Sequence, residues 1–193
     1  MLRGNQEFVM IDSQKLVYER AMSFASSANE EKKKVLLVKG GPGTGKSVIA
    51  INLLAKLTKA GKMAQYVTKN SAPREVYSSL LTKTFKKTEI SSLFKGSGSY
   101  VDTKHNDFDV LIVDEAHRLS EKSGLFYNKG ENQIKELIYS SKVSIFFVDD
   151  AQRIHLKDIG SSDEIRKWAS EFDSDIEEIE LTSQFRCAGS DGY

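Results

Sequence analysis

The sequence predicts an α/β fold in which a mainly parallel central sheet is covered by helices on both faces. Three observations predict it. Short apolar runs of strand length alternate with longer stretches whose apolar residues recur at helical spacing. Several short runs are apolar throughout, as strands buried on both faces are. The chain has 193 residues, of which 39% are hydrophobic and 28% are charged, so we expect one globular domain over residues 1–193.

The first half of the chain begins with a helix. Residues 12–28 have apolar residues at helical spacing and few breakers. A charged turn separates them from a short buried strand at 35–38. Residues 46–60 are predicted to form a helix, which Gly61 can end because glycine adopts the left-handed conformation. A second strand is expected at 64–68.

The middle of the chain contains the least regular pattern. A helix is predicted at 73–85, where a proline in the first turn removes only an N–H group that the helix does not use. Residues 86–107 form a long connection with a Gly-Ser-rich centre, and connections of this length are usually functional or disordered. The remaining expected elements are a strand at 110–113, a helix at 132–140, a strand at 143–148, a helix at 162–172 and a strand at 176–181.

Composition and charge limit the compartment and the partners. The single cysteine, Cys187, cannot form an internal disulfide, and no apolar run approaches the ~20 residues of a membrane span. We therefore expect a cytoplasmic protein without a membrane segment. The net charge is +1, but residues 56–105 contain ten Lys and Arg against three Asp and Glu. This basic segment could face the phosphates of a nucleic acid or simply be solvated surface.

A phosphate-binding loop lies between the first expected strand and its helix. The sequence G-G-P-G-T-G-K-S matches the pattern G-x-x-x-x-G-K-[ST] at every fixed position. Its glycines let the backbone approach phosphate oxygens, and its amides point inward at a helix N-terminus. Lys46 should reach the β and γ phosphates of ATP, and the Ser47 hydroxyl should bind Mg²⁺. The expected nucleotide contacts of this loop are Gly40, Gly41, Pro42, Gly43, Thr44, Gly45, Lys46, Ser47 and Val48.

An acidic pair follows the strand at 110–113. Asp114 stands where a carboxylate can hold Mg²⁺ through water, and Glu115 can orient and deprotonate the attacking water. An acid in this place favours hydrolysis over transfer to a small acceptor, which disfavours a P-loop kinase. His117 follows closely, and it either contacts the γ-phosphate or caps the strand.

A second acidic pair, Asp149-Asp150, follows the strand at 143–148 and is followed by Ala151 and Gln152. Ligands of parallel sheets bind at the carboxyl ends of the strands, so both acidic pairs are expected at the same edge. The amide of Gln152 can then lie near the terminal phosphate and sense whether the nucleotide is intact. The alternative is a two-metal centre made of both pairs, for which the sequence offers no further histidine or carboxylate.

These three motifs together resemble motifs I, II and III of superfamily 1 helicases. The sequence D-D-A-Q favours superfamily 1, because the S-A-T sequence that superfamily 2 has as motif III is absent after the strand at 143–148. The spelling D-E-A-H-R-L looks most like a bacterial group of ATPases similar to the helicase-like part of Schlafen proteins. The resemblance implies a RecA-like P-loop NTPase fold and ATP with Mg²⁺ as ligands. It also implies a missing second RecA-like domain, so the chain is expected to be the first motor domain of a longer protein.

Three further segments resemble motifs of the same superfamily. Thr182 to Arg186 resembles motif IV, which implies that Phe185 stacks on adenine and that Arg186 reaches the γ-phosphate. Residues 11–14 resemble the Gln motif, which implies that the Gln14 amide reads the adenine edge. Residues 66–72 resemble motif Ia, which implies contacts with single-stranded DNA or RNA. The residues expected to make them are Thr68, Lys69 and Asn70.

The sequence thus predicts a superfamily 1 ATPase domain, with hydrolysis by Glu115, Lys46, Gln152 and Arg186. As an isolated domain it should hydrolyse ATP slowly, because half of the expected site is missing. The alternative function is a nucleotide-dependent signalling or defence switch that unwinds nothing. Stimulation of ATP turnover by single-stranded nucleic acid would separate the two.

Overall fold

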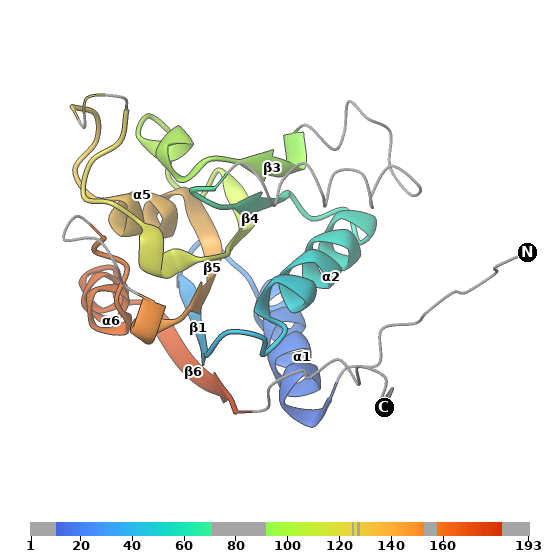
Figure 1. The fold of residues 1–193 in the computed structure, drawn as a ribbon. Coiled ribbons are helices and arrows are strands. Elements are labelled where there is room, and N and C mark those ends of the chain that lie inside the picture. Colours follow the sequence, from blue (N-terminus) through green and yellow to red (C-terminus); the bar gives the residue numbers. More distant parts are fainter. Residues whose placement is uncertain (1–10, 71–91, 125, 127, 153–157, 183–193) are drawn as a thin grey trace, which may run out of the picture.

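The computed structural model describes residues 11–70, 92–124, 126, 128–152 and 158–182. Its centre is a six-stranded sheet in the order β3-β2-β4-β5-β1-β6, and all neighbouring strands are parallel (Figure 1). The strands are β1 (Lys34–Gly40), β2 (Ala64–Val67), β3 (Phe94–Lys95), β4 (Phe108–Val113), β5 (Ser141–Val148) and β6 (Asp175–Leu181).

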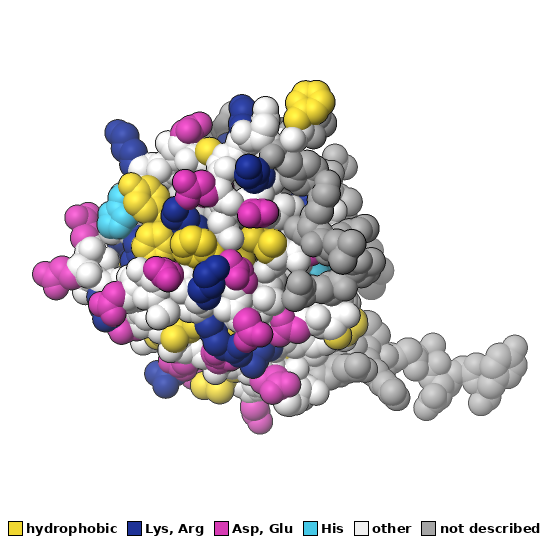
Figure 2. All heavy atoms as spheres, turned by 90° about the vertical axis from the view of Figure 1, so that its left-hand side faces the viewer, with side chains coloured by type: hydrophobic (Ala, Val, Ile, Leu, Met, Phe, Trp, Pro, Cys, Tyr) yellow, Lys and Arg dark blue, Asp and Glu magenta, His cyan; other side chains and the backbone are white. Residues whose placement is uncertain are grey.

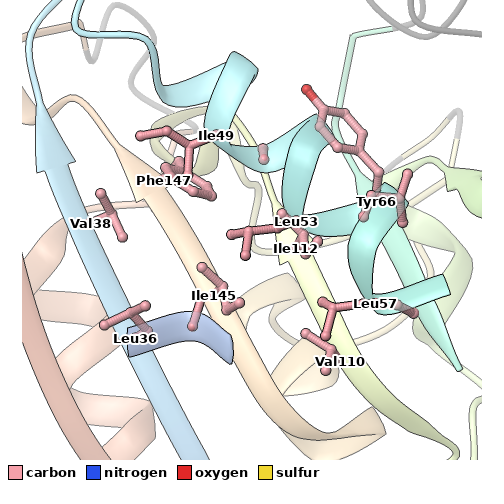
Figure 3. Packing of buried hydrophobic residues seen from close by; sticks show 14 of the residues in the cluster. Leu36, Val38, Ile49, Leu53, Leu57, Tyr66, Val110, Ile112, Ile145 and Phe147 are labelled. Carbon is pink, nitrogen blue, oxygen red and sulfur yellow. The ribbon is translucent and has the colours of Figure 1, made fainter. Parts of the chain in front are cut away.

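Helices cover both faces of this sheet, which confirms the predicted fold class. The helices α1 (Asp12–Ser26) and α2 (Lys46–Lys59) lie on one face, whereas α5 (Gln133–Ser140) and α6 (Ser162–Glu171) lie on the other (Figure 1). Alternate residues of β1 divide between the two hydrophobic clusters: Leu36 packs with α1 and α2, and Leu37 packs with α5 and α6. Figure 3 shows the first cluster. Both faces of the strands are therefore dry, as their continuous apolar runs predicted.

The principal difference from the sequence-based prediction is the edge strand β3. It lies within the stretch 86–107, which we expected to be an irregular connection, and it pairs with Tyr66 and Val67 of β2. A turn of 3₁₀-helix, η1 (Ser97–Tyr100), follows it directly. Phe94 packs at 5.3 Å from the ring of Tyr66. A two-residue strand offers no alternating pattern, so only its tertiary contacts reveal it.

The predicted helix at 73–85 lies outside the described residues. Within the part of the chain that the structure describes, none of the helices has the length and apolar character of a membrane span. The face over α5 and α6 carries acidic and basic side chains side by side, with a few apolar ones among them (Figure 2). This face therefore does not present the single-signed positive surface that a polyanion would select.

Candidate active site

The loop between β1 and α2 has a backbone that glycine makes possible. Gly43 and Gly45 adopt φ angles of +75° and +84°, in the left-handed region. A Cβ atom on Gly45 would lie 2.5 Å from Nε2 of Gln14, whereas one on Gly41 or Gly43 would meet nothing within 4 Å. The loop is thus tight against α1 but open on the outer side at these two glycines. With the N-terminus of the 14-residue helix α2 behind it, it fits a chain of phosphates.

Lys46 folds over this loop. Its Nζ donates hydrogen bonds to the carbonyl oxygens of Gly40 at 2.5 Å and Gly41 at 2.7 Å. The same Nζ lies 4.0 Å from Oδ2 of Asp149, at the end of β5. Burial lowers the pKa of the Lys46 ammonium, and nearby carboxylates, chiefly Asp149, oppose that shift. The cation is therefore placed between the loop and the second acidic pair, where a phosphate could replace the two carbonyls as its partner.

Asp114 is held rigidly at the end of β4. It is 3% exposed, and its backbone N–H donates to the carbonyl of Val67 at 2.9 Å. Oδ2 accepts from the Tyr66 hydroxyl at 2.5 Å, and Oδ1 accepts from the backbone N–H of Glu115 at 2.9 Å. Figure 3 shows the side chain of Tyr66 within the first hydrophobic cluster, with its hydroxyl oxygen at the end of the ring. The carboxylate is thus fixed in one orientation, as a group that holds Mg²⁺ through water must be.

The donor set fits Mg²⁺ bound together with a triphosphate. Mg²⁺ usually takes one or two protein oxygens and completes its shell with water and phosphate oxygens. Ser47, in the first turn of α2, and Asp114 are the two predicted protein ligands. Within the described ranges, no three histidine, cysteine or carboxylate side chains gather as a metal site. The alternative of a two-metal centre therefore finds no support in these residues.

Glu115 has an unusual backbone and a side-chain partner, Asn70, among the residues that follow β2. Its φ is +52°, in the left-handed region that non-glycine residues rarely adopt, and strain of this kind clusters at functional sites. Its Oε2 accepts a hydrogen bond from Nδ2 of Asn70 at 2.9 Å. The carboxylate of the predicted general base is thus tied to the residues that follow β2.

His117 is enclosed without a hydrogen bond. It lies in the 3₁₀ turn η2 (Ala116–Arg118) and is 2% exposed, and neither ring nitrogen has a partner among the described residues. Burial lowers its pKa, and the charge of Glu115 opposes this. Gly160 packs against the same turn, since a Cβ there would lie 1.7 Å from the carbonyl oxygen of Ala116. Of the two predicted roles, capping the strand does not occur within the described residues.

The two acids after β5 serve different purposes. Asp149 faces Lys46, and its Oδ2 is buried with no hydrogen-bond partner in the described part of the chain. Asp150 instead accepts from the backbone N–H of Ser162 at 3.0 Å and from its hydroxyl at 2.6 Å, so it holds the first turn of α6. Gln152 ends the turn η3 (Asp150–Gln152) and is half-buried. Both acidic pairs lie at the carboxyl edge of the parallel sheet. Because β5 lies between β1 and β4, the end of β5 stands between the loop and Asp114.

Gln14 braces the phosphate loop. Its side chain is fully buried, its Nε2 donates to the carbonyl of Thr44 at 2.9 Å, and its Oε1 accepts from the backbone N–H of Ile11 at 3.3 Å. To contact adenine, as the sequence predicts, the amide would have to leave these partners. The other predicted adenine contact, Phe185, and the predicted γ-phosphate contact, Arg186, lie outside the described residues.

The three residues predicted to touch nucleic acid differ in exposure. Thr68 is 1% exposed, and its hydroxyl accepts the backbone N–H of Asn70 at 3.3 Å, which argues against the direct contact predicted for its side chain. Lys69 and Asn70 are exposed. The Nζ of Lys69 donates to the Ser120 hydroxyl at 2.7 Å and lies 3.6 Å from Oδ1 of the buried Asp158. Sequence reasoning missed the contacts of Tyr66 and Asp158. Tyr66 lies in the segment that resembles motif Ia but was not among the residues expected to make a contact, and Asp158 stands in none of the predicted motifs.

Comparison with known proteins identifies both a family and a fold. The family model for Schlafen group 3, DNA/RNA helicase domain, matches residues 33–193. The Hef helicase domain of Pyrococcus furiosus has a TM-score of 0.50 and 11% identity over 88% of this chain and 38% of its own. AMPPCP-bound DnaA of Aquifex aeolicus has a TM-score of 0.47 and 20% identity over 93% of this chain and 50% of its own.

Pif1 helicase of Candida albicans has a TM-score of 0.47 and 14% identity over 95% of this chain and 42% of its own. The chain thus spans half or less of each of these three structures. The parallel sheet and the likeness to Hef show a RecA-like P-loop ATPase fold.

Proposed function

The chain belongs to the Schlafen group 3 DNA/RNA helicase domain family, and from this premise we propose that it hydrolyses ATP to ADP and phosphate with Mg²⁺. One observation carries the proposal. Lys46 lies across the phosphate loop. The Asp149 carboxylate follows the adjacent strand β5, and the carboxylates of Asp114 and Glu115 follow β4, one strand further along the sheet. This arrangement supports a triphosphate whose outermost group lies above the ends of β1, β5 and β4.

Each residue of the site has a step that it can perform. The loop amides and Lys46 would bind the β and γ phosphates, and Ser47 and Asp114 would hold Mg²⁺. When bound, the metal draws negative charge from the phosphate oxygens. Glu115 would accept a proton from the water that attacks the γ-phosphorus, while the bond between that phosphorus and the bridging oxygen of ADP breaks. The amide of Gln152 would contact the γ-phosphate, and Arg186 would complete the site.

We further propose that single-stranded DNA or RNA binds at the end of β2 and stimulates turnover. The exposed Lys69 and Asn70 support this, as does the basic segment of residues 56–105. A second RecA-like domain in a longer protein would supply the other half of the nucleotide site. The single cysteine of the chain is consistent with the reducing cytoplasm as the place of action.

One observation favours the second candidate, a signalling or defence switch that uses hydrolysis to change partners. All three residues predicted to touch nucleic acid are engaged within the protein. Thr68 is buried, Lys69 is paired with Asp158, and the Asn70 amide donates to Glu115. A surface built for phosphates would leave its cations less engaged. The switch therefore remains the alternative to be tested.

Binding and turnover of ATP test the proposal in the 193-residue chain. A fluorescent ATP analogue should bind in the presence of Mg²⁺, and Lys46→Ala should weaken that binding at least about ten-fold, because a charged partner of the phosphates is lost. Lys56→Ala, on the last turn of α2, is the matched control and should bind as the wild type does. Equal affinity of the wild type and Lys46→Ala would refute the nucleotide site.

Adding single-stranded nucleic acid to the ATPase assay distinguishes the motor from the switch. Poly(dT) and poly(U) should each be added at low and high salt, and stimulation of ATP turnover that fades with salt is expected. Turnover that neither polymer changes at any salt concentration would favour the switch over the motor.

A further inference from the structure

The residues at the end of β2 contact the segment that follows β4 at three of its residues. Tyr66 bonds to Asp114, Asn70 bonds to Glu115, and Lys69 bonds to Ser120. The backbone carbonyl of Val67 also accepts from the N–H of Asp114. We call residues 66–70 the β2 exit and residues 114–120 the β4 exit. The first has no phosphate motif, yet it holds both carboxylates of the predicted catalytic pair.

The hydrogen bond from Asn70 holds the Glu115 carboxylate on the β2 side of β4. In the sheet, β2 and β5 lie on opposite sides of β4, and β1 lies beyond β5. Two strand spacings, about 10 Å, therefore separate β4 from β1, which leads into the loop. A carboxylate that accepts from Asn70 points to the β2 side, whereas a base that deprotonates the attacking water must point to the β5 side.

We propose that Asn70 is a positioning residue that retains the Glu115 carboxylate on the β2 side and releases it when a single strand occupies the β2 exit. The inference rests on the proposed function for its second half only. The retention of Glu115 follows from the contact itself and needs no nucleic acid.

The coupling runs through the adjacent residue, Lys69. Its ammonium is shared between the Ser120 hydroxyl and the buried carboxylate of Asp158. A phosphate of a single strand would compete for the same ammonium and draw Lys69 outward. Because Asn70 is the next residue and its N–H is bonded to Thr68, a shift of the backbone at Lys69 also moves the Asn70 amide. Glu115 then loses its partner and can turn toward the γ-phosphate.

The test removes the amide donor and measures the basal rate. Asn70→Ala should raise single-turnover ATP hydrolysis by the 193-residue chain about five-fold, the weight of one hydrogen bond. Asn70→Asp should raise it further, because a second carboxylate repels Glu115. Asn128→Ala, in the exposed loop after the β4 exit, is the matched control and should leave the rate unchanged. The double variant Asn70→Ala/Glu115→Gln should show no rise, since the effect acts through Glu115.

Two further readings separate positioning from a merely structural role. The affinity for the fluorescent ATP analogue should stay within about two-fold of wild type in both Asn70 variants, so the change lies in kcat and not in KM. The ratio of rates with and without poly(dT) or poly(U) should fall toward one, because the basal rate already includes the released base.

An unchanged or lowered basal rate in folded Asn70→Ala and Asn70→Asp would overturn the proposal. If neither polymer stimulates the wild type but both variants still hydrolyse faster, the retention of Glu115 stands and only the nucleic-acid half of the proposed function fails. If the polymers stimulate the wild type and both Asn70 variants by the same factor, the coupling through the β2 exit is refuted.

Discussion

The two sides of the site are built by different means. On the β1 side, glycines with left-handed φ angles and the N-terminus of α2 present backbone groups, and the phosphate loop is open at Gly41 and Gly43. On the β2 side, side chains from one strand exit are bonded to side chains of the next, as in the pairs Tyr66–Asp114 and Asn70–Glu115. The first side is prepared to receive a ligand, whereas the second restrains the groups that would act on it.

This difference shows where binding and hydrolysis can be separated. A backbone cradle recognises any chain of phosphates, so binding depends on conformation and on Lys46. In the proposed mechanism, hydrolysis depends on the Glu115 carboxylate, which the neighbouring Asn70 can hold or release. Variants on the β1 side should therefore change affinity, and variants on the β2 side should change rate.

The largest expected effect comes from the base itself. Glu115→Gln keeps the size of the side chain but cannot accept the proton, so we expect ATP hydrolysis to fall by about 10²- to 10⁴-fold. Binding of the fluorescent ATP analogue should be spared. Glu121→Gln, an exposed acid nearby, is the control and should hydrolyse ATP as the wild type does. Normal turnover by Glu115→Gln would mean that another group removes the proton.

On the β1 side, the sharpest variant is Gly45→Ala. It forces a side chain into a left-handed backbone, at a cost of about 1–2 kcal/mol, and places a Cβ atom 2.5 Å from Gln14. The loop must shift, so the affinity for ATP should fall at least ten-fold. Gly61→Ala has the same kind of backbone with open space around it. It should lower the free energy of unfolding without changing ATP affinity, as binding titrations and denaturant unfolding can show.

Features that depend on backbone conformation could be predicted from the sequence, whereas contacts between pairs of side chains could not. The phosphate loop was predicted because the pattern of Gly40, Gly45, Lys46 and Ser47 indicates a backbone conformation directly. The meeting of both acidic pairs at one edge followed from the parallel sheet alone. The different contacts of Asp149 and Asp150 could not be predicted in this way, because they depend on where α6 begins in space. Tyr66 likewise has the apolar strand pattern of its neighbours, and only the register between β2 and β4 brings its hydroxyl to Asp114.

A smaller effect is expected from Tyr66→Phe, which removes the hydroxyl that holds Asp114. The buried carboxylate loses a donor, so the free energy of unfolding should fall by about 1–3 kcal/mol. The Mg²⁺ concentration that gives half-maximal binding of the ATP analogue should rise several-fold, because second partners of a metal-linked carboxylate tune its affinity. Tyr139→Phe, on the exposed side of α5, is the control. An unchanged Mg²⁺ dependence would show that Tyr66 serves only packing.

The smallest effect concerns His117, which lies between the two sides. Its pKa is lowered by burial, so below its ordinary value of 6.5 the unfolded chain binds a proton that the folded chain excludes. The free energy of unfolding should therefore fall as the pH drops below about 6.5. His117→Leu should flatten this fall and, since neither ring nitrogen has a partner among the described residues, should cost little stability at neutral pH.

Measured at pH 7, the same variant also decides the role of His117. The groups facing it include Glu115 and Lys46, one from each side of the site. If His117 contacts the γ-phosphate, His117→Leu should lower the rate of hydrolysis at unchanged affinity for ATP. If the ring only fills space beneath η2, both quantities should stay at the wild-type level. The first result would join the two sides through one side chain, and the second would make His117 a packing residue of η2.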